Sequence, residues 1–144
     1  GDGPHFWAAP YEVGAEFGGL GLTSPASSGA LRVRVKGDRP ATTIACVATD
    51  AAINKAQAKR LAIMANDGLS HAIRPAHAPF DGDTVFMAGT GRKPLGANAL
   101  RDVTEIGTVA ADCLARAVAR GVYEATALPF SGALPSWRDR FGPR

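Results

Sequence analysis

The pattern of hydrophobic and polar positions changes at about residue 42. Residues 42–49 form an apolar, β-branched run with almost no charge, and residues 84–89 repeat it, so each predicts a buried strand. After each run, apolar residues recur at helical spacing, which predicts helices over about 55–71 and 101–126. Strand, helix, strand, helix is the order of an α/β protein with helices packed on a sheet.

Both predicted helices carry signs of close packing. Asn54 and Gln57 have the spacing of a capping box, so the first helix should begin directly after Asn54. The second helix has small residues that would let another helix or sheet approach closely: Gly107, Ala110, Ala111 and Gly121. Helices so rich in alanine need more partner surface than two or three strands provide. We therefore expect one face of the chain to be buried against another polypeptide or another part of the protein.

Residues 1–41 differ in character from the rest. Residues 23–29 are rich in Ser, Pro and Gly and predict a flexible linker. Residues 31–36 alternate apolar and basic side chains and predict a short strand, followed by a turn over 37–40. A group of rings near the N-terminus could anchor this segment to something larger: His5, Phe6, Trp7 and Tyr11.

Composition and charge narrow the class of protein. The chain has 144 residues, 46% hydrophobic and 20% charged, which suits one compact globular domain. A net charge of +3 with scattered Lys and Arg is too mild to imply a nucleic-acid partner. No apolar run approaches the roughly 18 residues of a membrane span, and no signal peptide opens the chain. We expect a soluble, cytoplasmic protein without a membrane partner.

Metal and disulfide chemistry have little support in the sequence. The two cysteines, Cys46 and Cys113, form no C-x-x-C pair, and we interpret Cys46 as a small core residue of the first strand. His71 and His77 do not have the spacing of zinc ligands. We expect neither a metal site nor a cofactor.

Three segments could carry chemistry, and each has a purely structural interpretation. Thr42 stands at the start of the first strand, where threonine is common. Asp81-Gly82-Asp83 precedes the second strand and could be a tight turn, although buried carboxylates need a cationic or protonated partner. Residues 89–93 (Gly-Thr-Gly-Arg-Lys) read as a glycine-rich loop that could hold an anion, but they lack the Walker pattern.

Taken in order, several segments resemble one family. They are residues 42–51 (TTIACVATDA), 55–58 (KAQA), 67–69 (DGL), 73–77 (IRPAH) and 81–86 (DGDTVF). This set resembles the β-subunit of the DmpA-type self-processing hydrolases, which include aminopeptidases, a nylon-oligomer hydrolase and a pantetheine hydrolase. The resemblance implies a layered αββα sandwich, of which this chain supplies a β-α-β-α portion.

The resemblance also implies a mechanism and a division of the chain. Such precursors cleave themselves, and the new N-terminal residue becomes the nucleophile. By motif this residue is Thr42, so the cleavage site is Ala41–Thr42, and Asp81 and Asp83 match acidic residues that orient the nucleophile. Residues 1–41 would be the tail of an α portion with its linker, and residues 42–144 the catalytic β portion. The partners implied are the rest of the α portion, a small linear amide substrate and further copies in a homo-oligomer.

Two departures from the family pattern keep an alternative open. Position 41 is alanine, where members with a threonine nucleophile commonly carry asparagine, and only the tail of an α portion precedes Thr42. The alternative hypothesis is a non-catalytic α/β assembly module that has lost processing and binds a small anion through residues 89–93. The two hypotheses differ in whether the purified chain is ever cut before Thr42.

Overall fold

The computed structural model describes residues 3–22 and 42–142. The sequence elements expected at 23–29, 31–36 and 37–40, and the residue Ala41, lie outside the described residues. Along the described chain come a short 3-10 helix η1 (Ala9–Tyr11), β1 (Ile44–Ala51), α1 (Lys55–Ala72), β2 (Thr84–Lys93), α2 (Ala99–Glu124) and α3 (Trp137–Phe141). The predicted order of strand, helix, strand and helix after residue 42 is confirmed, as is the mixed α/β class.

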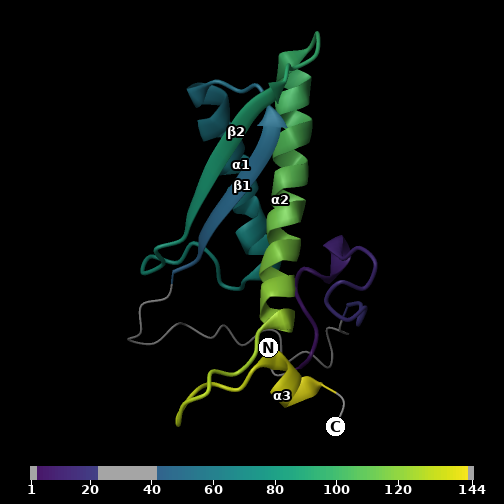
Figure 1. Cartoon of the computed structure of the whole chain (residues 1–144), viewed down its shortest axis with the longest axis vertical. Coiled ribbons are helices and arrows are strands. Elements are labelled where there is room, and N and C mark those ends of the chain that lie inside the picture. Colours follow the sequence, from purple (N-terminus) through teal and green to yellow (C-terminus); the bar gives the residue numbers. More distant parts are fainter. Residues whose placement is uncertain (1–2, 23–41, 143–144) are drawn as a thin grey trace.

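The two strands form a parallel sheet, in which Ile44 pairs with Thr84 and Thr49 with Gly89. Parallel neighbours need a crossover connection, and α1 supplies it. The helix begins where the sequence predicts, because the side chain of Asn54 accepts a 2.9 Å hydrogen bond from the Gln57 N–H and the Gln57 side chain accepts one of 2.9 Å from the Asn54 N–H. Both strands therefore start at the same end of the sheet (Figure 1).

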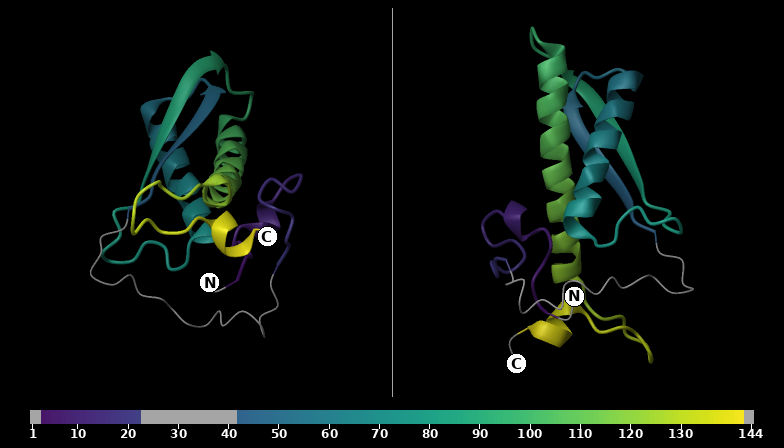
Figure 2. Two further views of the ribbon diagram at one scale, coloured as in Figure 1. Left: turned by 60° about the horizontal axis from the view of Figure 1, so that its bottom comes forward. Right: turned by 180° about the vertical axis from the view of Figure 1, so that it is seen from behind.

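The two long helices lie against each other on one side of the sheet (Figures 1 and 2). Their contact depends on small residues of both helices. A side chain on Gly68 would meet the Ala111 carbonyl, and one on Gly107 would meet Met64. Leu61 and Leu69 of α1 are fully buried, and burying each such side chain stabilises the fold by about 1.5–3 kcal/mol relative to exposure.

The opposite face of the sheet is uncovered by the described residues. Its side chains alternate with those that face the helices, and they are exposed: Ile44, Cys46, Ala48, Thr84, Phe86 and Ala88. Ile44 keeps 73% of its surface and Phe86 59%, although parallel sheets are normally covered on both faces. The interpretation of Cys46 as a core residue is therefore wrong for the described residues, because its side chain points to this open face.

One other expectation about local structure needs correction. Residues 89–93 are the second half of β2 rather than a loop, and Lys93 pairs with Ala51 after an irregularity in the register. The C-terminal segment also contains α3, which begins with a capping box between Ser136 and Asp139. Among the helices of the described residues, none combines the length and the apolar character that crossing a bilayer requires.

Candidate active site

Thr42 lies just before β1, at the end of the sheet where β2 also begins. The parallel register places it beside the segment that leads into Thr84, because the Thr84 N–H donates a 2.9 Å hydrogen bond to the Thr43 carbonyl. Thr42 itself is exposed. The fold therefore brings the first residue of the predicted catalytic portion next to the Asp-Gly-Asp segment.

Asp83 binds the backbone directly after Thr42. Its Oδ1 accepts a 2.8 Å hydrogen bond from the Thr43 N–H. Its Oδ2 is buried and accepts no hydrogen bond from the described residues. A buried carboxylate oxygen without a donor is costly, so this atom is suited to receive a proton donor from a neighbouring group.

Gly82 lies against the side chain of Thr42. A Cβ built on Gly82 would be 2.6 Å from Thr42 Oγ1 and 3.3 Å from its Cγ2. Only a residue without a side chain allows this approach, and the φ of Gly82 is not in the left-handed region. The glycine between the two aspartates is thus required by contact with the threonine rather than by a turn conformation.

Asp81 shapes the loop that precedes β2. Its Oδ2 accepts a 2.9 Å hydrogen bond from the Ala78 N–H, and its own N–H donates a 2.8 Å bond to the Ala78 carbonyl. The structure therefore brings Thr42 together with both halves of the Asp-Gly-Asp segment, but it connects the two aspartates to different backbone groups. Ala41, the other predicted cleavage-site residue, lies outside the described residues.

The segment 89–93 does not form the anion-binding loop of the alternative hypothesis. Gly89 faces Ile53, whose Cγ1 would be 2.7 Å from an added Cβ, so this glycine serves a close packing contact. Lys93 Nζ forms a 2.9 Å ion pair with Asp50 Oδ2 at the far end of the strands from Thr42. The hydrogen bond from Lys93 lowers the pKa of Asp50, and that of Lys93 is raised by the same contact. Within the described residues, no group of three or more His, Cys, Asp or Glu could hold a metal ion.

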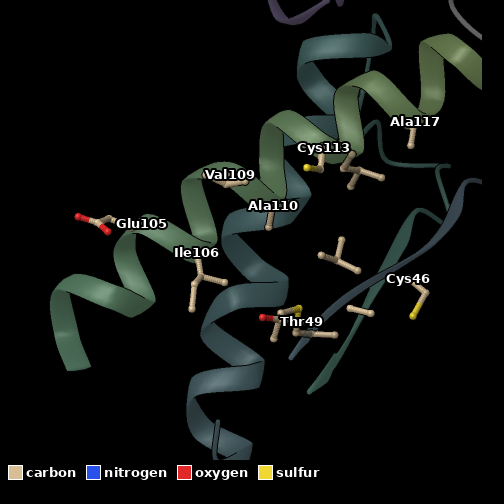
Figure 3. Close-up of a pocket in the computed structure, with 12 residues that line it drawn as sticks. Cys46, Thr49, Glu105, Ile106, Val109, Ala110, Cys113 and Ala117 are labelled. Atoms are coloured by element: carbon tan, nitrogen blue, oxygen red, sulfur yellow. The ribbon is translucent and has the colours of Figure 1, made fainter. Parts of the chain in front are cut away.

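Two apolar pockets flank β1. One of about 510 Å³ opens between β1 and α2, where Ile106 and Ala110 face the strands (Figure 3). Thr42, Asp81 and Asp83 do not line it. The other, of about 550 Å³, begins at Thr43 and Ile44 and continues along the C-terminal end of α2 to Trp137. Sequence reasoning missed this second pocket, because residues 43–44 and 114–137 meet only in the folded chain.

The amino-acid sequence is similar to a peptidase family and to several mycobacterial proteins. Residues 12–133 match the description of peptidase family S58. Proteins of Mycobacterium tuberculosis and Mycobacterium bovis, each named an uncharacterized aminopeptidase, are 47% identical over 109 residues, covering 69% of this chain and 31% of theirs. One of Mycobacterium leprae with the same kind of name is 49% identical over 88 residues, covering 54% of this chain and 24% of its own. The chain thus matches less than a third of the length of these relatives.

Proposed function

Because the chain belongs to peptidase family S58, we propose that it is the nucleophile-bearing part of an amide hydrolase that cuts its own chain between Ala41 and Thr42. The observation that carries this proposal is the junction at the start of the two strands. There Asp83 binds the Thr43 N–H at 2.8 Å, and Gly82 lies against the Thr42 hydroxyl. Such contacts fix the backbone and side chain of the residue that must attack.

Self-cleavage would begin with attack of Thr42 Oγ1 on the carbonyl carbon of Ala41. The C–N bond to Thr42 breaks, the hydroxyl proton goes to the departing nitrogen, and an ester joins Ala41 to the threonine oxygen. Water then hydrolyses this ester, which leaves a carboxylate on Ala41 and restores the hydroxyl of Thr42. The products are fragments of 41 and 103 residues, which together make the 144 of the chain.

The freed α-amine of Thr42 would then act as the base for substrate turnover. An α-amine has a pKa of about 7.7–8.0 and can accept the hydroxyl proton near neutral pH, whereas the amide nitrogen before cleavage has no such basicity. The hydroxyl oxygen attacks the substrate amide, the amine leaves with the proton, and water releases the acyl group. Cleavage therefore also activates the enzyme.

Asp83 is the aspartate that we propose as the positioning residue. Its Oδ1 binds the Thr43 N–H, and its buried Oδ2 accepts no hydrogen bond from the described residues. An α-ammonium group on Thr42 would supply a charged donor for this second oxygen. A neighbouring carboxylate stabilises the charge that the amine gains with its proton. Asp81, bonded to Ala78, holds the loop in place and keeps Gly82 against the threonine.

The pocket that begins at Thr43 supports a linear amide with an apolar group as substrate. It is lined mainly by aliphatic side chains of β1 and α2, and Trp137 lies at its end. The names of the mycobacterial relatives favour an aminopeptidase over a pantetheine or nylon-oligomer hydrolase. A panel of aminoacyl anilides and N-acylated linear amides, assayed with the full-length protein, distinguishes these substrate classes.

The open face of the sheet supports a larger assembly. We propose that it packs on a second sheet from the part of the protein that corresponds to the unmatched length of the relatives, in an αββα sandwich, and that several such units form a symmetric oligomer. Exposed Ile44 and Phe86 would then be buried between the sheets.

The test of self-processing is intact-protein mass spectrometry during incubation near neutral pH. A species that begins at Thr42 supports the proposed nucleophile, and Thr42→Ala should abolish it. A chain that stays intact, and that remains intact after Ala41→Asn, would contradict the proposal and leave the non-catalytic module as the explanation. Restoration of cleavage by Ala41→Asn would identify a stalled precursor instead.

A further inference from the structure

The apolar pocket of about 550 Å³ begins directly beside the proposed nucleophile. Its first lining residue, Thr43, follows Thr42 in the chain. The Thr43 N–H donates to Asp83 and the Thr43 carbonyl accepts from the Thr84 N–H, so both groups are directed toward β2. The pocket opens on the other side, because β1 lies between β2 and α2 and the pocket continues along the C-terminal half of α2 (Figures 1 and 2). The proposed nucleophile therefore has a carboxylate toward β2 and an apolar space toward α2.

The polar groups at the far end of this pocket are already bonded to other residues. Ser136 Oγ donates a 2.8 Å hydrogen bond to Asp139 Oδ2, and Trp137 Nε1 donates one of 3.0 Å to the Pro4 carbonyl. Among the described residues that line the pocket, none carries a charge. A charged group that entered it would lose water without gaining a partner, which is costly. The pocket is therefore suited to an aliphatic or aromatic group.

The path of the proton in the proposed reaction assigns this group to one half of the substrate. Thr42 Oγ1 bonds to the carbonyl carbon, the α-amine of Thr42 takes the hydroxyl proton, and that proton passes to the nitrogen that departs when the amide C–N bond breaks. Because Asp83 holds the amine in that reaction, the departing nitrogen lies on the β2 side of Thr42. The acyl group extends from the same carbon away from the departing nitrogen, toward the side of β1 on which the pocket opens.

We propose that this pocket is the subsite for the acyl half of the substrate, and that the substrate carries an uncharged aliphatic or aromatic side chain next to the scissile carbonyl. In an aminopeptidase substrate that side chain belongs to the N-terminal residue. Leucine and phenylalanine fit this description, whereas the side chains of lysine and glutamate would bring a charge into a space without a partner for it. The assignment rests on the proposed function, since it takes the proton path from Thr42.

Val122 of α2 is suited to testing the subsite without touching the nucleophile. It lines this pocket and does not line the pocket shown in Figure 3. Its side chain keeps 49% of its surface exposed, so a larger side chain at this position has space to enter the pocket. Thr108 is a matched control, because it is exposed on the same helix and lines neither pocket.

The kinetic experiment varies the two halves of the substrate separately in the full-length protein. The 4-nitroanilides of alanine, leucine and lysine share a leaving amine, and the 4-nitroanilide and methylamide of leucine share an acyl group. We expect Val122→Trp to lower kcat/KM for the leucine anilide relative to the alanine anilide at least about tenfold, and Thr108→Trp to leave that ratio unchanged. We also expect the unaltered protein to prefer the leucine anilide over the lysine anilide by at least about tenfold.

Two kinetic results would overturn the proposal. One is a leucine-to-alanine ratio that Val122→Trp does not change. The other is an effect of Val122→Trp that differs between the anilide and the methylamide of leucine, because the pocket would then receive the leaving amine. Circular dichroism verifies that each variant still folds.

A binding measurement separates this proposal from the proposed nucleophile. Full-length Thr42→Ala cannot form the ester, and 4-bromophenylalaninamide carries a heavy atom that quenches tryptophan fluorescence on contact. We expect saturable quenching that is lost when Trp137→Phe is added, since Trp137 lies at the end of the pocket. A protein that hydrolyses none of the amides but shows this quenching would contradict the nucleophile and support the pocket. Quenching that is absent, or that does not depend on Trp137, would overturn the subsite even if Thr42 is the nucleophile.

Discussion

The carboxylate of Asp83 accepts a 2.8 Å hydrogen bond from the backbone N–H of Thr43, 40 residues earlier in the chain. This bond joins the segment before β2 to the residue that follows Thr42. It explains why a threonine and an Asp-Gly-Asp sequence, unremarkable when taken separately, form one site.

Replacement of Thr42 provides the most direct prediction. Thr42→Ala removes the attacking oxygen and should abolish both the 103-residue fragment and amide hydrolysis in the full-length protein. Thr42→Ser keeps a hydroxyl and should retain processing. Intact mass over time measures the first effect and release of an amine from substrate the second. Processing by Thr42→Ala at the normal rate would refute the mechanism.

Two variants of Asp83 separate its charge from its hydrogen bond. Asp83→Asn keeps an oxygen that can accept from the Thr43 N–H but loses the charge that would hold an ammonium on Thr42. It should lower kcat/KM by about 10²-fold and shift the pH profile, with little change in melting temperature. Asp83→Ala should also lower the melting temperature. If Asp83→Asn were fully active with an unchanged pH profile, the role assigned to its charge would be wrong.

Gly82→Ala should block the nucleophile without unfolding the protein. The added Cβ would be 2.6 Å from Thr42 Oγ1, so the hydroxyl must move, while the backbone of Gly82 accepts an alanine. Gly121→Ala is a matched control, because a Cβ at that position meets nothing within 4 Å. We expect loss of cleavage only in Gly82→Ala, measured by intact mass, and normal far-ultraviolet circular dichroism in both variants.

The contact between α1 and α2 predicts an unusual glycine substitution. Replacing glycine by alanine inside a helix usually stabilises it by about 0.8–1.0 kcal/mol. At Gly68 the new methyl group would meet the Ala111 carbonyl and lie 3.0 Å from Leu114 Cβ, so Gly68→Ala should instead destabilise the protein by about 1–3 kcal/mol. Urea denaturation measures the difference. A stabilised Gly68→Ala would mean that the helices are further apart than described.

The ion pair between Glu16 and Arg116 should contribute less to stability in acid. The hydrogen bond from Arg116 lowers the pKa of Glu16 below its ordinary value of 4.5, with a smaller contribution from Arg120. A carboxyl group whose pKa is lower in the folded state stabilises the fold above 4.5, and this contribution disappears as the pH falls through the lowered pKa. The melting temperature should therefore fall more steeply in acid for the unaltered chain than for Glu16→Gln, in which this step is absent. Thermal unfolding followed by circular dichroism over a pH series measures the difference.

Features that depend on residues close together in the sequence could be predicted, and features that depend on distant residues could not. The start of α1 was predictable because Asn54 and Gln57 are three residues apart and carry their own signal. The second half of β2 was not, because its Gly, Arg and Lys residues are poor strand formers, and the pairing of Lys93 with Ala51 exists only in the folded sheet. The contact of Glu16 with Arg116 spans 100 residues and leaves no local pattern.

The candidate site likewise combines features that the sequence predicts with features that only the folded sheet reveals. Thr42, Asp81 and Asp83 were recognised as an ordered set, but sequence gave no means to decide which aspartate contacts the threonine segment. The register of the two parallel strands supplies that information, since it places Asp83 opposite Thr43, whereas Asp81 binds Ala78 within its own loop. The apolar strand predicts a buried Cys46, whereas the sheet face that the described residues leave open exposes it.

The parallel pairing of β1 and β2 determines when, during translation, the residues of the candidate site can come together. Thr42 emerges from the ribosome first, and Asp83, which binds the Thr43 N–H, follows about 40 residues later, roughly 2–8 s at ordinary elongation rates. In addition, α1 must fold as the crossover connection before β2 can pair with β1. Under the proposed mechanism, a nascent chain would keep the Ala41–Thr42 bond intact until β2 has paired with β1, and release of the Thr42 amine would mark a molecule whose strands are already paired.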